Sequence, residues 1–340
     1  MKRSTLRLIV SLAIVLFLGW VVLFNSSSPR VLVLQSVSPD SDWGIRIDQG
    51  IQTALRANRQ PITVITHYMN LDEAGSDTGF RVAVAAARAE IANHKPDVLI
   101  AVDDESNALV ASQLPAQDRP AIVYTAILQS PEAYGYSTQT LATGIEESVP
   151  LAAIFDLLRT VMGDRPLKIA ALGVDDLTGR AELARLLQVS WRGHTLVASG
   201  LVTNFAQWQA FVSEQASEAD VLLVLSTEML GGSQPDEFLP EQTVIEWTET
   251  NARALPIGIR HSFVRYGGSL AVVSPPRVYG RLAMQMSIDW IAKGLETDMP
   301  APRTVTEFNI AFRQTILKNR GIELPPVYRE LARATDGLYP

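Results

Sequence analysis

The chain contains no cysteine, which excludes disulfide bonds, thiolate metal sites, cysteine nucleophiles and a lipid-modified N-terminal cysteine. Positive charge is also scarce, because 29 basic residues stand against 36 acidic ones and the net charge is -7. Outside the extreme N-terminus no cluster of lysine and arginine offers a surface for the phosphate backbone of a nucleic acid. Nucleic acid is therefore not expected as a partner.

The sequence motifs of common enzyme sites are missing as well. There is no G-x-S-x-G elbow, no P-loop and no G-x-G-x-x-G after the first predicted strand. The acidic pairs 103–104 and 175–176 are adjacent in sequence, a spacing that does not set a general acid against a base. We expect no catalytic residue, no metal site and no cofactor. The histidines lack metal-binding spacing; they are His67, His94, His194 and His261.

The N-terminus carries a segment that addresses a membrane. Three basic residues precede 17 uncharged residues, 8–24. A signal-peptide core usually has about 7 to 15 apolar residues and a membrane-spanning helix about 17 to 25, so the length favours an anchor. The best small-x-small cleavage candidate, 26–28, is followed by Pro29. Residues 1–29 are expected to be a signal-anchor or a cleaved signal peptide. Either one places residues 30–340 outside the cytoplasm, in the periplasm. If the segment is not cleaved, it tethers the protein to the inner membrane.

From residue 30 onward, short apolar runs rich in β-branched residues alternate with amphipathic helical patterns. Apolar strands that alternate with helices predict parallel sheets covered on both faces, so the fold class is α/β and doubly wound. A chain of 340 residues with 47% hydrophobic residues can form two cores, and the number of strands fits two sheets better than one. The predicted strands are 31–36, 62–68, 97–102, 121–127, 168–174, 194–199, 220–226, 255–259, 269–274 and 304–312.

Polar segments follow several of these strands. In open parallel sheets, ligands bind beyond the carboxyl ends of the strands. Each segment also precedes a predicted helix, so Asp42, Ser106 or Asp176 could equally serve as a helix N-cap, which is the simpler interpretation for any single position. The segments are 36–42, 103–106, 125–129, 173–178 and 226–229.

The C-terminal third reads "HSFVRYGGSLAVVSPPRVYGRLAMQMSIDWIAKGLETDMPAPRTVTEFNIAFRQTILKNRGIELP". Together with the strand order, it resembles the type I periplasmic substrate-binding proteins, specifically the ABC-transporter group with tryptophan- and tyrosine-type binding proteins. The resemblance covers about residues 31–328. The matching positions are Ser262, Phe263, Val264, Gly267, Gly280, Lys293, Gly294, Asn309, Gly321, Ile322 and Pro325.

The resemblance implies two parallel-sheet lobes joined by a three-crossing hinge that close on a small molecule without bond chemistry. It places lobe 1 at 30–145 plus 266–297 and lobe 2 at 146–265 plus 298–340. "HSFVRYGG" then becomes one hinge crossing, in which Gly267 suits a turn with positive φ.

The ligand does not follow from the resemblance, because the loops after strands three and four depart from the family pattern. The acidic strand ends fit a small molecule that is amino-acid-like or bears an amine, and they also fit solvated carboxylates at a rim. Trp43 and Tyr124 either stack on the ligand or pack in the protein. The candidate ligand-binding residues are Ser38, Asp42, Trp43, Asp103, Glu105, Ser106, Tyr124, Thr125, Asp175, Asp176, Thr178, Glu228 and Ser262.

Three functions are compatible with this pattern. The first is an extracytoplasmic solute-binding protein that serves an ABC permease. The second is a membrane-anchored sensory protein that passes its ligand state to a histidine kinase or another signalling partner, which the length of the segment 8–24 favours. The third is an α/β enzyme of unrecognised type.

Overall fold

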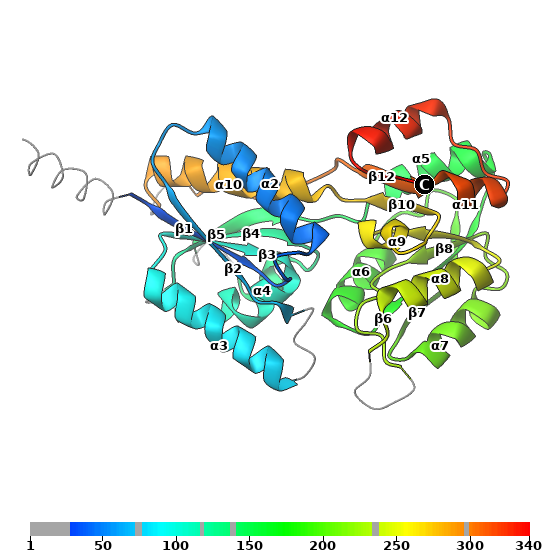
Figure 1. Ribbon diagram of the computed structural model, residues 1–340, viewed down its shortest axis with the longest axis horizontal. Coiled ribbons are helices and arrows are strands. Elements are labelled where there is room, and N and C mark those ends of the chain that lie inside the picture. The colour runs from blue at the N-terminus through cyan, green and yellow to red at the C-terminus, as the bar shows by residue number, and fades with distance from the viewer. Residues whose placement is uncertain (1–27, 72–76, 116–118, 137–140, 233–237, 296–298) are drawn as a thin grey trace, which may run out of the picture.

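The protein consists of two α/β lobes that lie side by side (Figure 1). The computed structural model describes residues 28–71, 77–115, 119–136, 141–232, 238–295 and 299–340. The predicted anchor or signal segment 8–24 lies outside these residues. Within the described ranges, no helix combines the length and apolar character needed to cross a bilayer.

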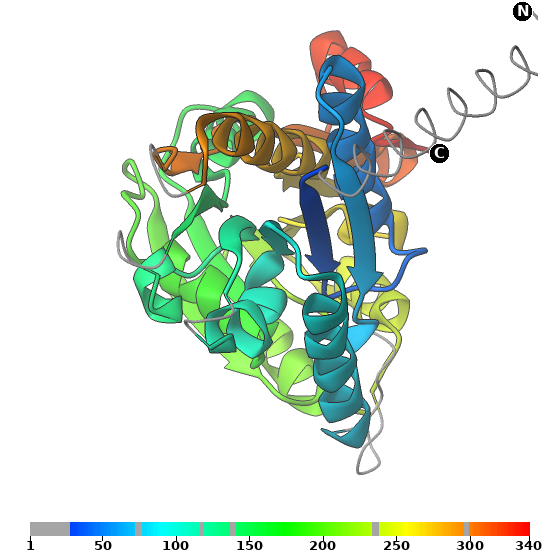
Figure 2. The same ribbon diagram turned by 90° about the vertical axis from the view of Figure 1, so that its left-hand side faces the viewer.

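The first lobe is built on a six-stranded parallel sheet with the order β11-β5-β4-β3-β1-β2. Helices α2 and α10 cover one face, and α3 and α4 cover the other (Figures 1 and 2). Its strands are β1 (Arg30–Gln35), β2 (Thr63–Tyr68), β3 (Val98–Val102), β4 (Ala121–Ile127), β5 (Ala142–Glu146) and β11 (Arg303–Thr304). Its helices are α2 (Asp42–Ala57), α3 (Asp77–His94), α4 (Asp103–Leu109), η2 (Ala111–Gln113), η4 (Pro131–Tyr134) and α10 (Pro276–Lys293).

The second lobe is built on a seven-stranded sheet with the order β13-β12-β10-β9-β8-β6-β7, in which β12 runs antiparallel to β10. Its strands are β6 (Lys168–Val174), β7 (Thr195–Val202), β8 (Val221–Val224), β9 (Leu255–Gly258), β10 (Leu270–Val273), β12 (Asn309–Arg313) and β13 (Leu338–Tyr339). Its helices are α5 (Leu151–Met162), α6 (Leu177–Leu187), α7 (Phe205–Ala210), η5 (Phe211–Gln215), α8 (Glu241–Asn251), α9 (His261–Arg265), α11 (Gln314–Asn319) and α12 (Pro326–Ala334).

The central strands are apolar because both of their faces are covered. Every residue of β3, β4, β8, β9 and β10 is buried. Such strands show no polar alternation, as expected for parallel sheets between two helical layers. The predicted α/β architecture with two doubly wound sheets is confirmed.

The chain passes between the lobes three times, at 147–150, 274–275 and 305–308. The second passage lies later than expected, because β10 pairs with β9 and β12 in the second sheet. "HSFVRYGG" is therefore not a hinge crossing. It forms α9 and a turn inside the second lobe, where Phe263 packs in the core and Gly267 has a φ of 107°. The single strand expected at 304–312 is also two strands, β11 and β12, one in each sheet.

Helices α2 and α10 approach each other closely at two glycines. A Cβ atom on Gly50 would lie 2.1 Å from the carbonyl oxygen of Arg277, and one on Gly280 would lie 2.1 Å from that of Ile47. Both clashes involve backbone, which cannot move aside as a side chain can. The two glycines therefore set the distance between α10 and α2, and with it the position of α2 at the junction of the lobes.

We predict that Gly50→Ala destabilises the protein by about 1–3 kcal/mol, because the added methyl group forces the two helices apart. Urea denaturation followed by circular dichroism measures this change. Gln52→Ala, on the exposed face of the same helix, is the matched control and is expected to change stability by less than about 0.5 kcal/mol. Equal stability of the two variants would contradict the close packing.

Candidate functional site

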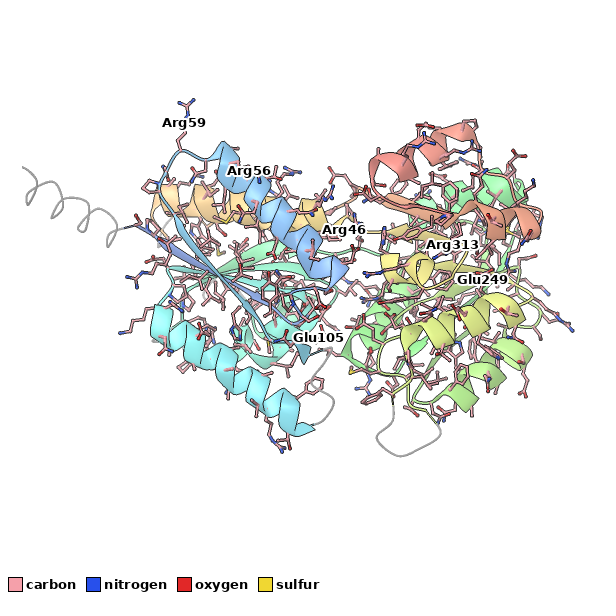
Figure 3. All side chains as sticks on the ribbon, viewed as in Figure 1. Arg46, Arg56, Arg59, Glu105, Glu249 and Arg313 are labelled. Atoms are coloured by element: carbon pink, nitrogen blue, oxygen red, sulfur yellow. The ribbon has the colours of Figure 1, made fainter. Side chains whose placement is uncertain are left out.

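Side chains from both lobes make contact where the carboxyl ends of the two sheets face each other. Thr178 on α6 donates a hydrogen bond from Oγ1 to Oε1 of Glu105 on α4, over 2.6 Å. Arg185, also on α6, forms an ion pair of 3.1 Å with Glu146 and donates to the carbonyl oxygen of Leu128. Figure 3 shows Glu105 at this junction. The strand-end segments of the two lobes are thus brought together.

One arginine lies at the centre of this junction. Arg260 follows β9 and is 30% exposed; its Nε and Nη2 donate to Oε1 of buried Glu182 over 3.0 and 2.8 Å. The other carboxylate oxygen of Glu182 accepts from the backbone N–H of Ser226 over 2.7 Å. Among the described residues, Nη1 of Arg260 donates to no acceptor. The guanidinium group is therefore held on one edge and open on the other.

Carboxyl groups surround Arg260, and we call them the interlobe acidic cluster. Charge–charge interactions connect its members across the junction. Lobe 1 contributes Asp103, Asp104 and Glu105, and lobe 2 contributes Asp176, Glu182 and Glu228. The seventh member, Glu147, comes from the first crossing.

The surroundings shift the titration of several members toward higher pH. Burial raises the pKa of Glu147 to about 7, although the charge of Arg260 partly opposes the shift. Desolvation by neighbouring protein atoms raises the pKa of Glu228 to about 8, and the charge of Arg260 partly opposes this shift. Glu228 is nevertheless an exposed residue, so the desolvation is partial and the carboxyl group is accessible to solvent. Near neutral pH these two carboxyl groups therefore titrate.

Most members of the cluster have hydrogen-bond partners. Asp103 accepts from the hydroxyl of Ser36 and from the backbone N–H of Ser106. Asp104 accepts from the backbone of Leu128 over 3.0 Å and from the hydroxyl of Tyr134. Glu228 is the exception, because it has no hydrogen bond or ion pair within the part of the chain that the structure describes.

Three non-glycine residues near the carboxyl ends of strands have a left-handed backbone conformation. The φ angles are 70° at Asp103, 56° at Ala126 and 54° at Met229. This conformation costs free energy for residues with a Cβ atom and tends to occur where the surrounding structure fixes a functional geometry. Each of the three positions is at or just beyond the carboxyl end of a strand.

The structure places five of the predicted site residues at the junction. Asp176 also caps α6, as the alternative interpretation expected, because its side chain accepts from the backbone N–H of Gly179 over 2.5 Å. Ser106 caps no helix; its hydroxyl is buried and donates to the carbonyl oxygen of Val102. The residues brought together are Asp103, Glu105, Asp176, Thr178 and Glu228, whereas the side chain of Ser106 is fully buried in lobe 1.

Two predicted residues lie in the core of lobe 1. Tyr124 is 1% exposed, and its ring stacks on that of Tyr136 with centroids 5.6 Å apart. Thr125 is fully buried on the adjacent position of β4. Because both faces of this strand are covered by helices, neither side chain has room for a ligand. Tyr124 and Thr125 therefore lie outside the junction.

Trp43 and Asp42 lie at the start of α2. Trp43 packs against the lobe 1 core, with its ring 6.3 Å from that of Tyr279. Asp42 forms an ion pair of 2.9 Å with Arg46, and its Oδ2 lies 3.7 Å from Nδ1 of His261 in lobe 2. The N-cap position of α2 is Ser41, which makes no side-chain capping bond. Asp42 therefore connects the lobes and does not cap the helix.

The remaining predicted residues have local partners. Ser38 donates to Asp40 over 2.8 Å, and Asp175 pairs with Arg180 over 2.6 Å on the exposed surface. The hydrogen bond that Arg180 donates lowers the pKa of Asp175, and the charge of Arg180 acts in the same direction. Ser262 donates to Glu241 over 3.4 Å.

Sequence reasoning missed three members of the site. Arg260 follows an apolar strand directly, which is the same signal that identified the acidic strand ends. Glu147 follows β5, which was not predicted as a strand. Glu182 lies inside α6 and meets Arg260 across 78 residues, so no local pattern could reveal it. Among the described residues, no group of three histidine, aspartate or glutamate side chains is placed to hold a metal ion.

The chain matches no protein-family model and no curated protein by sequence. Its fold is nevertheless similar to that of several solved structures. An ABC domain from Streptococcus pneumoniae in complex with L-Trp has a TM-score of 0.64 at 15% identity, covering 90% of this chain and 98% of that one. The chain has the type I periplasmic binding protein fold.

Two further structures with this fold are similar to the chain. One is a substrate-binding protein with adhesive properties from Clostridium difficile, in its ligand-free, open form. Its TM-score is 0.65 at 17% identity, with 87% of this chain and 96% of that one covered. The other is a periplasmic sugar-binding protein from Pseudomonas fluorescens, with a TM-score of 0.55 at 13% identity and 90% of each chain covered. The fold predicted from the resemblance is thus confirmed.

The shifted carboxyl groups predict a pH-dependent stability. Glu228 keeps its proton up to about pH 8 in the folded state, whereas the unfolded chain releases it near the ordinary pKa of glutamate. The stabilisation from this proton is complete below the ordinary pKa and is lost as pH rises through about 8. We expect the melting temperature of the wild type to fall from about pH 5.5 to about pH 8.5, and Glu228→Gln to flatten this fall.

Differential scanning fluorimetry across this range provides the measurement. Glu218→Gln removes an exposed carboxylate elsewhere in lobe 2 and should leave the wild-type slope unchanged. The assignment of Glu228 is wrong if both variants follow the wild-type slope.

Proposed function

We propose that the protein is an extracytoplasmic solute-binding protein that closes its two lobes on a small molecule for uptake by an ABC permease. The observation that carries the proposal is the junction itself, where strand-end residues of both lobes surround Arg260. A molecule that contacts both lobes stabilises their closed arrangement, because those contacts exist only when the lobes are together. Three crossings at 147–150, 274–275 and 305–308 allow such a motion.

We further propose that the ligand bears an amine. The interlobe acidic cluster has seven carboxyl groups and one arginine, and five of the carboxyl groups interact with Arg260, so one guanidinium group does not balance the whole cluster. Within the described residues, no hydrogen bond or ion pair engages the carboxylate of Glu228, and we propose that it meets an external partner. A protonated amine placed there favours the charged form of Glu228 and supplies the hydrogen bonds that the carboxylate lacks. An amino-acid-like ligand also fits, because its carboxylate can meet the open Nη1 edge of Arg260.

A thermal-shift screen with amines, amino acids, sugars and nucleosides tests the ligand class. We expect an amine-bearing compound to stabilise the protein, by about 2.7 kcal/mol at 100 times its dissociation constant. Glu228→Gln should weaken that binding about tenfold or more, since the charge that holds the amine is lost. Titration calorimetry measures the affinity.

Asp156→Asn is the matched control, because it removes a carboxylate from an exposed ion pair on the outside of lobe 2. It should bind like the wild type. The affinity of the wild type for the amine should rise with pH through about 8, as Glu228 loses its proton, and this rise should be absent in Glu228→Gln. Stabilisation by sugars alone would contradict the amine, and turnover of a substrate without stabilisation would favour the enzyme alternative.

A sensory role is the second candidate, and the length of the apolar segment 8–24 favours it. A protein held at the membrane suits a signalling partner beside it, such as a histidine kinase, whereas free diffusion suits delivery to a permease. The same fold serves both roles, because closure of the lobes presents a changed surface to either partner.

We predict that the native protein keeps its N-terminal segment and partitions with the inner membrane. Intact-mass spectrometry of the protein from membrane and periplasmic fractions is the measurement. A mature chain that begins near residue 29 would remove the anchor and favour the soluble transport role. Replacing Val15 by Arg is a useful comparison, because a charge in the middle of the apolar run should weaken membrane insertion.

A further inference from the structure

The last residues of the chain form a segment that belongs to the second lobe. β13 pairs with β12, with Leu338 opposite Phe312 and Tyr339 opposite Arg313. The guanidinium of Arg313 lies over the ring of Tyr339, 5.2 Å from its centroid. Residues 335–340, which we call the C-terminal segment, therefore move with lobe 2.

The same segment contacts the two helices that cover lobe 1. Nη1 of Arg46 on α2 donates to the carbonyl oxygen of Thr335 over 3.4 Å and lies 3.8 Å from Oδ2 of Asp336. Nη2 of Arg277 on α10 lies 3.4 Å from the same carboxylate oxygen. One aspartate of lobe 2 is thus shared by two arginines of lobe 1.

Both arginines are held by neighbours in their own lobe. Arg46 is only 12% exposed and pairs with Asp42 over 2.9 Å, whereas Arg277 donates from Nε to Gln49 over 2.6 Å. Each guanidinium group is therefore already oriented before Asp336 arrives, so little side-chain entropy is lost when the contact forms.

This contact is separate from the junction of α4 and α6. Figure 3 labels Arg46 at the end of α2 that faces lobe 2, and Glu105 at a different level of the same junction. Asp336 belongs to lobe 2 and both arginines belong to lobe 1, so a change in the angle between the lobes changes their separation, more at Arg46 than at Arg277, which lies two residues beyond the second crossing.

We propose that the C-terminal segment is an interlobe latch, in which Asp336 binds Arg46 and Arg277 and holds the lobes together before any ligand binds. The latch goes beyond the proposed function: it sets the balance between open and closed forms, whatever the ligand. Asp336 is 63% and Arg277 49% exposed, so each pair shifts this balance only by about two- to fivefold. Because each ion pair changes the ratio of closed to open forms by so little, the lobes remain free to open.

The lack of cysteine in the chain makes the test direct. Spin labels on Arg59→Cys in lobe 1 and Val327→Cys in lobe 2 occupy exposed positions, and pulsed electron spin resonance measures the distance between them without ligand. We expect Asp336→Asn to raise the open fraction, seen as longer distances, by about two- to fivefold. Arg277→Gln should act in the same direction, and the double variant should open less than the two single effects combined predict.

Glu330→Gln is the matched control, since it breaks the exposed pair between Glu330 and Arg333 within α12 of lobe 2. It should leave the distances unchanged. The latch is overturned if Asp336→Asn and Arg277→Gln both give the distance distribution of the labelled parent, or if the control opens the lobes as much as they do. Since no ligand is present, a failed ligand screen leaves this result unaffected, and a failed latch leaves the proposed binding function standing.

Discussion

Arg260 is a cation placed among carboxyl groups that belong to both lobes and to the first crossing. Carboxylates gathered away from bulk water repel one another and lose hydration, so they remain charged only where a positive group or hydrogen-bond donors compensate. Glu182 fixes the orientation of Arg260, and the backbone N–H of Ser226 fixes Glu182 in turn. The strand-end loops of the two sheets can face each other because this arrangement offsets part of their charge.

The sheets were largely predictable from sequence because buried parallel strands are continuous apolar runs. Nearly every predicted strand lies within a few residues of its position in the structure. The strand β5 was not predicted because "ATGIE" is short and interrupted by a glycine. This residue, Gly144, has to be glycine because the carbonyl oxygen of Tyr124 lies too close to leave room for a side chain. The second crossing was predicted at the wrong place because it depends on the pairing of β10 with β9 and β12, and pairing between separate segments cannot be seen in the local sequence. No residue in "HSFVRYGG" shows on which side of it the lobes separate.

The site was predictable only as far as topology determines it. Parallel strands bring their carboxyl ends to one edge, which is why the sequence predicts that Asp103, Asp176 and Glu228 lie at one place. In the structure, Glu105 interacts with both Asp103 and Glu228, and Glu228 with Asp176. A residue near a strand end can point to the junction or to the core, and which of the two it does depends on how helices cover the faces of the sheet. Tyr124 is an example, because its side chain is in the core. Partners in distant segments, such as Glu182 and Arg260, emerge only from the folded structure.

Two opposing effects set the position of the lobes. In the arrangement of this structure, desolvation raises the pKa of Glu147 and of Glu228, so this arrangement is costly when both groups are charged. Contacts of Thr178 with Glu105 and of Arg46 with the C-terminal segment act in the other direction. Hydrogen bonds and partly exposed ion pairs contribute modestly, so neither effect dominates. On the proposed function, a bound amine removes the cost that the carboxylates impose, and closure then follows ligand binding because the remaining contacts already favour it.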